Sequence, residues 1–386
     1  MIIRIASSLL AVGLLASTAG LTTASADDIT LPKNISWTAF GTTSSGYAQS
    51  VGIGQMLSNN YGVSLRIIPG ENDVSRMIPL TTGQANLCAC GIAAYFAQEG
   101  VLMFAAKDKG PMRLFNLFNN IGTSGQTAAV AADSGVKSIR DLRGKRVTWI
   151  RSSPANNTNM TAFLAFGGLT LDDVTKVEVP GTRQSIEAVI NGQADAVWAS
   201  TVTSALNQLS ATPRGVYFPS MPFNDAEGWA RAQAIAPWFA PAEVTSFIDG
   251  ATNEGPYQGM NYPYPLFVGT LDTSDVLAYG LTAAVMNNFD SIKDSGPGMI
   301  GYRLDRQALA YIFPYHPAAI RYYEEQGLWT AELQQHNDRL VQRQDVLATA
   351  WEQMSQRDVP EEQFQAAWMK QRAAALRAAG LPVVFE

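Results

Sequence analysis

Residues 36–56 have the sequence SWTAFGTTSSGYAQSVGIGQM, which decides the fold class. An apolar run over residues 35–40 indicates a buried strand that ends at Gly41, and helical spacing of apolar residues starts at Tyr47. The turn between them holds four hydroxyl side chains, those of Thr42, Thr43, Ser44 and Ser45. Such a turn leaves the amide groups of the helix N-terminus facing outward, where they can bind an anion. Ordinary helix capping explains the same residues, so both interpretations stay open.

The pattern of strand, turn and helix recurs along the chain. Apolar runs predict strands at residues 63–68, 113–119, 127–132 and 146–150, and Asp73 is expected to cap a helix that starts near residue 74. This alternation predicts mostly parallel sheets, and a chain of 386 residues suits two α/β lobes better than one core. In the segment 211–260, rich in proline, glycine and aromatic residues, we expect a strand at 215–219 and a helix near 241–247.

The first 26 residues have the features of a secretory signal peptide. They contain one basic residue, Arg4, and an apolar core at residues 9–21, and they end in Ala24-Ser25-Ala26. Cleavage is expected after Ala26, which would place the mature chain in the periplasm. The formal net charge is −6 and there is no basic cluster, so nucleic acid and anionic membrane surfaces are poor partners.

Cysteine, histidine and motif content give little support for an enzyme. Cys88 and Cys90 are too close in sequence for an unstrained disulfide and are expected to be two small buried residues. Of the two histidines, His316 and His336, neither lies in a nucleophile context. The chain has no GxSxG, P-loop or HExxH motif, and no GxGxxG after a strand. We therefore expect no catalytic residue, no metal and no cofactor.

With these elements placed, the chain resembles the TAXI family of TRAP-transporter substrate-binding proteins. The matching blocks are spread over most of the sequence: GTTSSGYAQSVG (41–52), SRMIPLTTGQANLC (75–88), SGVKSIRDLRGKRVTWI (134–150), GLTLDDV (168–174), SIEAVINGQADAVWAS (185–200) and YHPAAIRYY (315–323). Two features depart from the family pattern. Hydroxyl residues replace glycines in the 41–47 turn, and Cys90, Gly91 and Ile92 stand where a Gln-Ser-Asp group is usual. These changes leave the ligand open.

The resemblance implies an α/β fold like that of type II periplasmic binding proteins, with two lobes around a ligand cleft. The expected division is a signal peptide (1–26), lobe I (27–122, completed by a return segment at 259–328), lobe II (123–258) and a C-terminal helical extension (329–386). For the extension, Leu and Trp at helical spacing predict helices at 331–356 and 360–379. The implied protein is a monomer that closes around a small organic anion, a carboxylate or an amino acid, and delivers it to a TRAP permease.

In such a fold the ligand contacts come from turns at the mouths of both sheets. The turns that qualify are 41–47, 70–73, 91–95, 151–159, 181–184 and 200–203. Arg151 and Arg183 are candidates to hold a carboxylate, and Tyr47, Tyr95 and Trp198 either wall the ligand or fill the core. The full set of candidate ligand residues is Thr42, Thr43, Ser44, Ser45, Tyr47, Tyr95, Arg151, Asn156, Asn157, Arg183, Trp198 and Ser200.

Two other functions remain open from the sequence. A sensory binding protein that signals through a membrane kinase would use the same closure around a ligand. An exported enzyme on the same scaffold would need a nucleophile or an acid/base pair in the cleft, and the scarcity of histidine argues against it.

Overall fold

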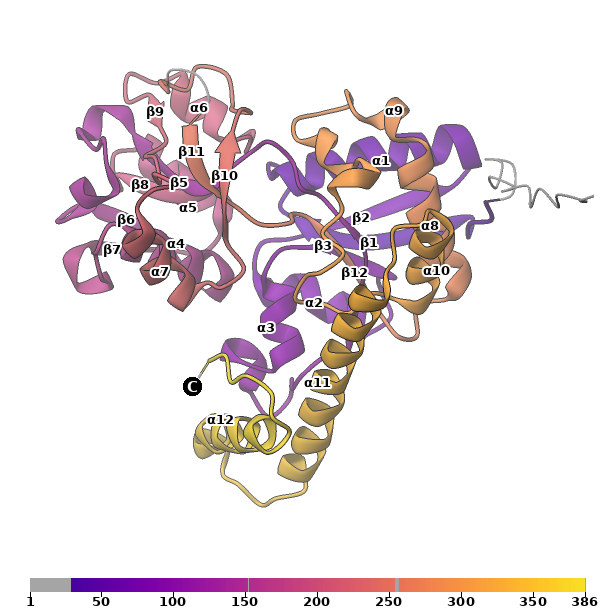
Figure 1. Cartoon of the computed structure of the whole chain (residues 1–386). Coiled ribbons are helices and arrows are strands. Elements are labelled where there is room, and N and C mark those ends of the chain that lie inside the picture. Colours follow the sequence, from indigo (N-terminus) through magenta and orange to yellow (C-terminus); the bar gives the residue numbers. More distant parts are fainter. Residues whose placement is uncertain (1–28, 152, 254–256, 386) are drawn as a thin grey trace, which may run out of the picture.

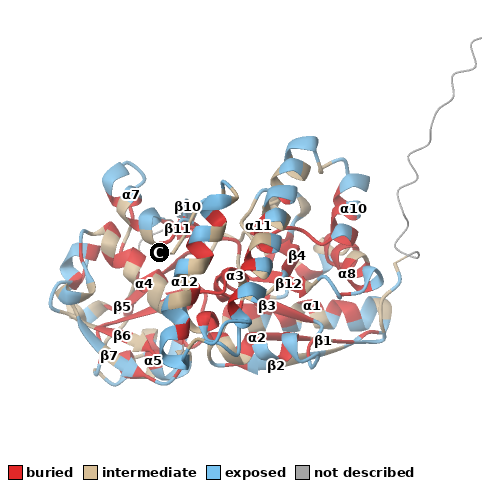
Figure 2. Cartoon of the chain, turned by 90° about the horizontal axis from the view of Figure 1, so that it is seen from below, coloured by how far each residue is buried: buried red, intermediate tan, exposed pale blue. Residues whose placement is uncertain are grey.

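The computed structural model describes residues 29–151, 153–253 and 257–385. The predicted signal peptide (1–26) therefore lies outside the described residues. The chain forms two α/β lobes, shown in purple and magenta in Figure 1, with a pair of C-terminal helices beside lobe I. Figure 2 shows buried residues concentrated along the strands of both sheets, while the outward turns of the helices are exposed.

Lobe I is built around a five-stranded sheet with the order β2-β1-β3-β12-β4. Its strands are β1 (Asn34–Phe40), β2 (Ser64–Gly70), β3 (Leu87–Cys90), β4 (Leu114–Asn119) and β12 (Leu266–Thr270). Its helices are α1 (Ser45–Tyr61), α2 (Asp73–Thr81), α3 (Ala93–Glu99), α8 (Asp275–Asn287), α9 (Phe289–Ile292) and α10 (Pro317–Glu325). Strand β12 runs antiparallel between β3 and β4. Its Phe267 stacks on Phe118 at 4.4 Å, which anchors the returning strand in the core.

Lobe II repeats this plan with the strand order β7-β6-β8-β5-β9. Its strands are β5 (Gln126–Ala131), β6 (Arg146–Ile150), β7 (Thr175–Val179), β8 (Ala196–Ser200) and β9 (Val216–Tyr217), with a separate hairpin of β10 (Ala240–Val244) and β11 (Tyr257–Asn261). Its helices are α4 (Pro154–Phe166), α5 (Thr182–Ile190), α6 (Leu206–Ser210) and α7 (Ala226–Ile235). The strand that enters from lobe I, β5, is antiparallel to β8. Each sheet is thus completed by one antiparallel strand that follows a crossing between the lobes.

Within the described residues, six short 3₁₀ helices connect these elements. They are η2 (Leu102–Ala105), η3 (Ala132–Ser134), η4 (Ile139–Leu142), η5 (Leu171–Asp173), η6 (Met299–Tyr302) and η7 (Leu304–Arg306). None of the helices in the described ranges combines the length and the apolar character that a membrane crossing requires.

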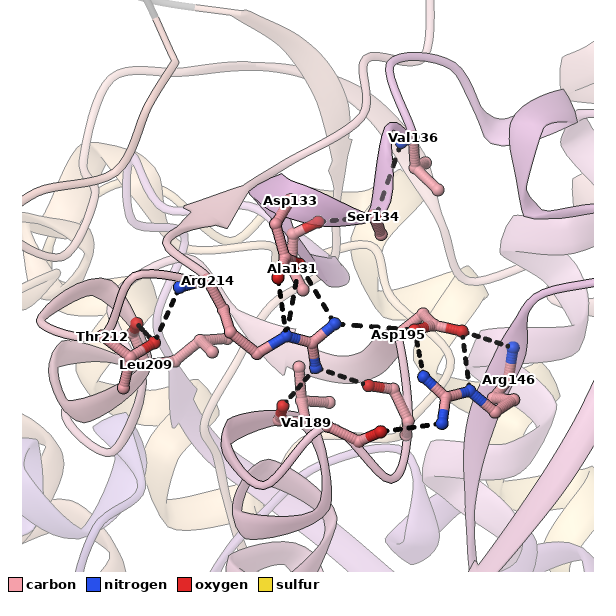
Figure 3. A network of polar contacts seen from close by, with 12 residues as sticks. Ala131, Asp133, Ser134, Val136, Arg146, Val189, Asp195, Leu209, Thr212 and Arg214 are labelled. Carbon is pink, nitrogen blue, oxygen red and sulfur yellow. Dashed lines mark hydrogen bonds and ion pairs between the residues drawn. The ribbon is translucent and has the colours of Figure 1, made fainter.

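A network of arginines and aspartates holds lobe II together at the start of β6 and β8 (Figure 3). Asp195 accepts from Arg146 Nη2 at 2.7 Å and from Arg146 Nε at 3.1 Å. Arg214 lies 3.6 Å from the same carboxylate and 3.0 Å from Asp133. Burial favours the protonated form of Asp195, but the hydrogen bonds and charges of Arg146, then of Arg214, lower its pKa overall.

The C-terminal extension consists of α11 (Ala331–Ser355) and α12 (Glu361–Ala378), in yellow in Figure 1. The two predicted helices are therefore confirmed. They hold α3 through the fully buried Glu99, whose carboxylate accepts from Arg343 at 2.6 and 2.7 Å and pairs with Arg372. Arg343 also donates to the carbonyl of Pro382, and Arg372 to that of Phe385, so the end of the chain folds back onto α3.

The predicted fold class, two α/β lobes with a C-terminal helical extension, is confirmed. Two local predictions are wrong. Residues 240–244 form strand β10 instead of a helix, because they pair along their length with β11, and this tertiary pairing overrides local preference. Cys88 and Cys90 are buried as expected, but they are joined by a disulfide.

Candidate ligand-binding cleft

The carboxyl ends of the parallel strands of both lobes face one cleft, as expected for open α/β sheets. It encloses a cavity of ≈ 50 Å³, small beside the roughly 300–1,000 Å³ of most ligand pockets. The lobes are in direct contact there, since Ser204 Oγ of lobe II donates to the carbonyl of Thr43 in lobe I at 2.8 Å. The structure therefore describes a closed arrangement of the lobes.

Seven of the twelve candidate residues line this cavity: Thr43, Ser44, Ser45, Asn156, Arg183, Trp198 and Ser200. Ser44 caps α1, accepting from the amide of Tyr47 at 3.2 Å. Arg183 is at the rim, with 68% of its side chain exposed, and its Nε donates to Glu187 at 2.9 Å. Ser200 closes strand β8, and its hydroxyl has no hydrogen-bond partner among the described residues.

The two lobe I tyrosines among the candidates, and Thr42, lie elsewhere. Thr42 is exposed beside the cavity. Tyr47 packs against the apolar core of lobe I. Tyr95 belongs to α3 and stands edge-on to Trp238 of lobe II at 6.2 Å between ring centroids. Aromatic packing thus accounts for both tyrosines.

Arg151 and Asn157 are also outside the cavity. Arg151 is exposed in a separate groove that also includes Trp149. Asn157 accepts from the amide of Ile150 at 3.0 Å and donates to its carbonyl at 2.9 Å. The amide of Asn157 therefore joins the start of α4 to the end of β6.

The first turns of three helices, α1, α4 and α5, contribute to the cavity lining. None of these fully described first turns contains an acidic residue. The dipoles of α1 and α5 direct partial positive charge toward the cavity, whereas the start of α4 already has a carboxylate, that of Asp73, as its partner. Glu71 is the one carboxylate among the described lining residues.

A carboxylate of lobe I already occupies the start of helix α4 in lobe II. Asp73 accepts from the amide of Ala155 at 2.8 Å and from Ser153 Oγ at 3.2 Å. The prediction that Asp73 caps its own helix is wrong, because Asn72 caps α2 by accepting from the amide of Ser75 at 2.9 Å. Asp73 instead joins the two lobes behind the cavity.

Arg76 is the partner of Asp73, at 2.8 Å, and both side chains are fully buried. Burial raises the pKa of the Asp73 carboxyl, and the charge of Arg76 opposes that rise. The guanidinium lies 3.3 Å from the ring centroid of Phe40, which lines the cavity. Its Nε and Nη1 have no hydrogen-bond partner among the described residues. A buried cation with two unsatisfied donors thus lies directly behind the cavity wall.

Thirteen further lining residues were not among the candidates: Phe40, Gly41, Glu71, Gly91, Ile92, Gln126, Ala155, Asn159, Thr182, Ala199, Thr203, Tyr262 and Tyr264. Most of them fall in the turns already noted in the sequence. The two tyrosines come from the segment YPYPLF (262–267), whose density of aromatic residues was a usable signal. Burial raises the pKa of Tyr264 to about 12, so its hydroxyl stays protonated and can donate a hydrogen bond.

One family of known proteins matches most of the chain. Residues 38–327 match the NMT1-like family. None of the curated proteins compared with the chain matches it. Solved structures resemble this chain only at low sequence identity.

Three solved structures illustrate this likeness. A protein of Bordetella bronchiseptica RB50 is 17% identical, with a TM-score of 0.44 over 80% of this chain and 98% of its own. The alkanesulfonate-binding protein SsuA from Xanthomonas axonopodis pv. citri, bound to MOPS, is 15% identical, with a TM-score of 0.41 over 78% and 96%. The periplasmic aliphatic sulphonate binding protein SsuA from Escherichia coli is 14% identical, with a TM-score of 0.41 over 92% and 90%.

Proposed function

The chain belongs to the NMT1-like family, and on that premise we propose that it is a solute-binding protein whose lobes close around a small organic anion. The observation that carries the proposal is a pair of lining residues, Thr182 and Ser200, whose buried hydroxyl oxygens have no partner in the described chain. Leaving such atoms unsatisfied costs about 1–3 kcal/mol each. An anionic ligand that accepts from them would recover this cost.

The two lobes supply different parts of the receptor for the ligand. Lobe I contributes the α1 turn and the neutral hydroxyl of Tyr264, and lobe II contributes Thr182, Arg183 and Ser200. Because a bound anion contacts both walls, it favours the closed arrangement over the open one. The crossings at residues 120–125 and 262–265 are the positions where a hinge would act.

The resemblance to TAXI proteins extends this proposal to transport. The chain is exported to the periplasm by its signal peptide, captures a carboxylate or an amino acid as a monomer, and delivers it to a TRAP permease. The reaction is binding and release, with no cofactor and no chemical change of the ligand. Mass spectrometry of the released ligand tests this last point, because an enzyme would return a modified molecule.

A thermal-shift screen of the mature protein with monocarboxylates, dicarboxylates and amino acids identifies the ligand, since a ligand bound to the native state raises Tm. The variant Thr182→Val/Ser200→Ala then tests the site. We expect its Kd for that ligand to rise about tenfold for each hydroxyl removed. Its Tm without ligand should not fall, because neither hydroxyl has a partner in the described chain to lose.

The control is Ser291→Ala, which removes a lobe I hydroxyl that donates to the carbonyl of Asn288 at 2.7 Å. Ser291 is not among the lining residues of the cleft. It should leave Kd unchanged. An unchanged Kd in Thr182→Val/Ser200→Ala would refute the assignment of the cleft.

A further inference from the structure

A second cavity, of ≈ 250 Å³, lies between helix α11, the folded-back end of the chain and the residues before α10. Most of its surface is apolar, with Ile312, Leu340, Leu381 and Val384 among the lining residues. It is separate from the cleft, because the two cavities share no lining residue. The end of the chain is held in place because Arg343 donates to the carbonyl of Pro382 and Arg372 to that of Phe385, so this cavity is a built feature of the extension.

The charged side chains among the described lining residues of this cavity are all positive. Its described lining includes Arg339 and Arg343 but no acidic residue. Arg343 is already satisfied by Glu99 and by the carbonyl of Pro382. Arg339 is exposed, and no ion pair or hydrogen bond is recorded for it within the described residues. One cation at the opening is therefore available to an anionic group.

A buried polar atom points to the same kind of ligand. Tyr311 is a lining residue of the cavity, and its hydroxyl is shielded from solvent and has no partner in the described chain. Burial raises its pKa far above the ordinary value, so it remains a neutral donor. His336, beside it, contacts the carbonyl of Tyr311 at 2.6 Å, which fixes this segment against α11.

We propose that this cavity is a second ligand site, for an amphiphilic monocarboxylate with an aliphatic chain. The chain would lie among Leu340, Leu381 and Val384, and the carboxylate would pair with Arg339. The hydroxyl of Tyr311 can donate a hydrogen bond to a polar atom of the ligand or to a water molecule. This site is independent of the solute bound in the cleft.

Calorimetric titration of the full mature chain with octanoate, octan-1-ol and octylammonium tests the proposal. Octanoate should bind at one site per chain, more tightly than octan-1-ol, and octylammonium should bind least. In Arg339→Ala the affinity for octanoate should fall about fivefold, while that for octan-1-ol stays the same. In Lys370→Ala, which removes an exposed cation of α12 outside the cavity, octanoate binding should be unchanged.

A filling variant adds a second line of evidence. Leu340→Trp should abolish octanoate binding, and circular dichroism checks that it is folded. The cleft variant Thr182→Val/Ser200→Ala should bind octanoate as the wild type does. The proposal is overturned if octanoate does not bind, if Arg339→Ala binds it unchanged, or if the cleft variant loses it.

Discussion

The two lobes share one sheet plan but place their charges differently. Lobe I keeps the Arg76–Asp73 pair fully buried directly behind the cleft. Lobe II keeps its largest charge network, around Asp195, at the opposite end of its sheet and partly exposed (Figure 3). At the cleft it presents hydroxyl groups and the exposed Arg183 instead. The lobe I wall of the cleft is therefore backed by a buried ion pair, whereas the lobe II wall presents hydroxyl groups and an exposed arginine.

The largest effect is expected where the lobe I pair is broken. Asp73→Asn leaves the guanidinium of Arg76 buried without a counter-charge and removes the carboxylate that accepts from Ala155 across the lobes. Breaking a buried pair in this way costs about 3–5 kcal/mol. Urea unfolding of the ligand-free protein measures it. The matched control is Asp290→Asn, an exposed pair with Lys293 at the same i,i+3 spacing, which should not change the unfolding free energy.

A smaller loss is expected for the lobe II network. Asp195→Asn removes a charge that accepts hydrogen bonds from Arg146 at 2.7 and 3.1 Å. Hydrogen bonds to charged groups contribute about 1.5–3 kcal/mol, and partial exposure to solvent places this one toward the lower value. Ligand affinity should stay the same, because the network is outside the cleft lining. If Asp195→Asn changed Kd as much as a cleft variant does, the charge network of lobe II would not be separate from the cleft.

The same network predicts a dependence on pH. The pKa of Asp195 is lowered in the folded state, so its ionised form stabilises the protein above the unfolded pKa of about 3.9. This stabilisation is lost as the pH falls through the folded pKa. The difference in unfolding free energy between wild type and Asp195→Asn should therefore be constant near neutral pH and shrink below about pH 4. A difference that stays constant as the pH falls below 4 would contradict the role of this carboxylate.

The smallest effect on stability is expected at the rim of the cleft. Arg183 is mostly exposed and pairs with Glu187 one turn along the same helix. Such pairs contribute about 0.3–0.5 kcal/mol, so Arg183→Ala should lower the unfolding free energy by no more than this. Chemical denaturation with and without 0.5 M salt (about the level that screens surface pairs) measures the change. A loss of unfolding free energy above 1 kcal/mol would mean that charged groups also stabilise the lobe II wall of the cleft.

Local sequence patterns were sufficient for most of the fold. The apolar run before Gly41 and the spacing after Tyr47 mark β1 and α1, and the terminal helices are predicted to within a residue or two. The strand β10 was not predictable, because it is defined by pairing with β11 and its own residues include Pro241. The disulfide between Cys88 and Cys90 was missed because spacing alone argued against it.

Lining residues of the cavity could be predicted where they lie at the ends of strands. They could not be predicted where only tertiary packing places them. The turns after β1, β6 and β8 supply Ser44, Asn156 and Ser200 to the cavity. Arg76 lies in the middle of α2, and its position behind Phe40 depends on burial that no spacing reveals. Tyr95 was assigned to the cleft because it follows a suitable turn, but its ring faces the aromatic residues of lobe II and the C-terminal tail.

The antiparallel strand β12 has a consequence for how the chain acquires its structure. Lobe II is one continuous stretch of sequence, so its contacts can form as soon as that stretch is available. The sheet of lobe I cannot be completed until β12 is available, because β12 lies between β3 and β4 and follows β4 in the sequence by roughly 150 residues. Until residues 266–270 arrive, β3 keeps an open, apolar edge of the kind that promotes association between chains. The late strand thus leaves lobe I with an unpaired sheet edge while lobe II can already be complete.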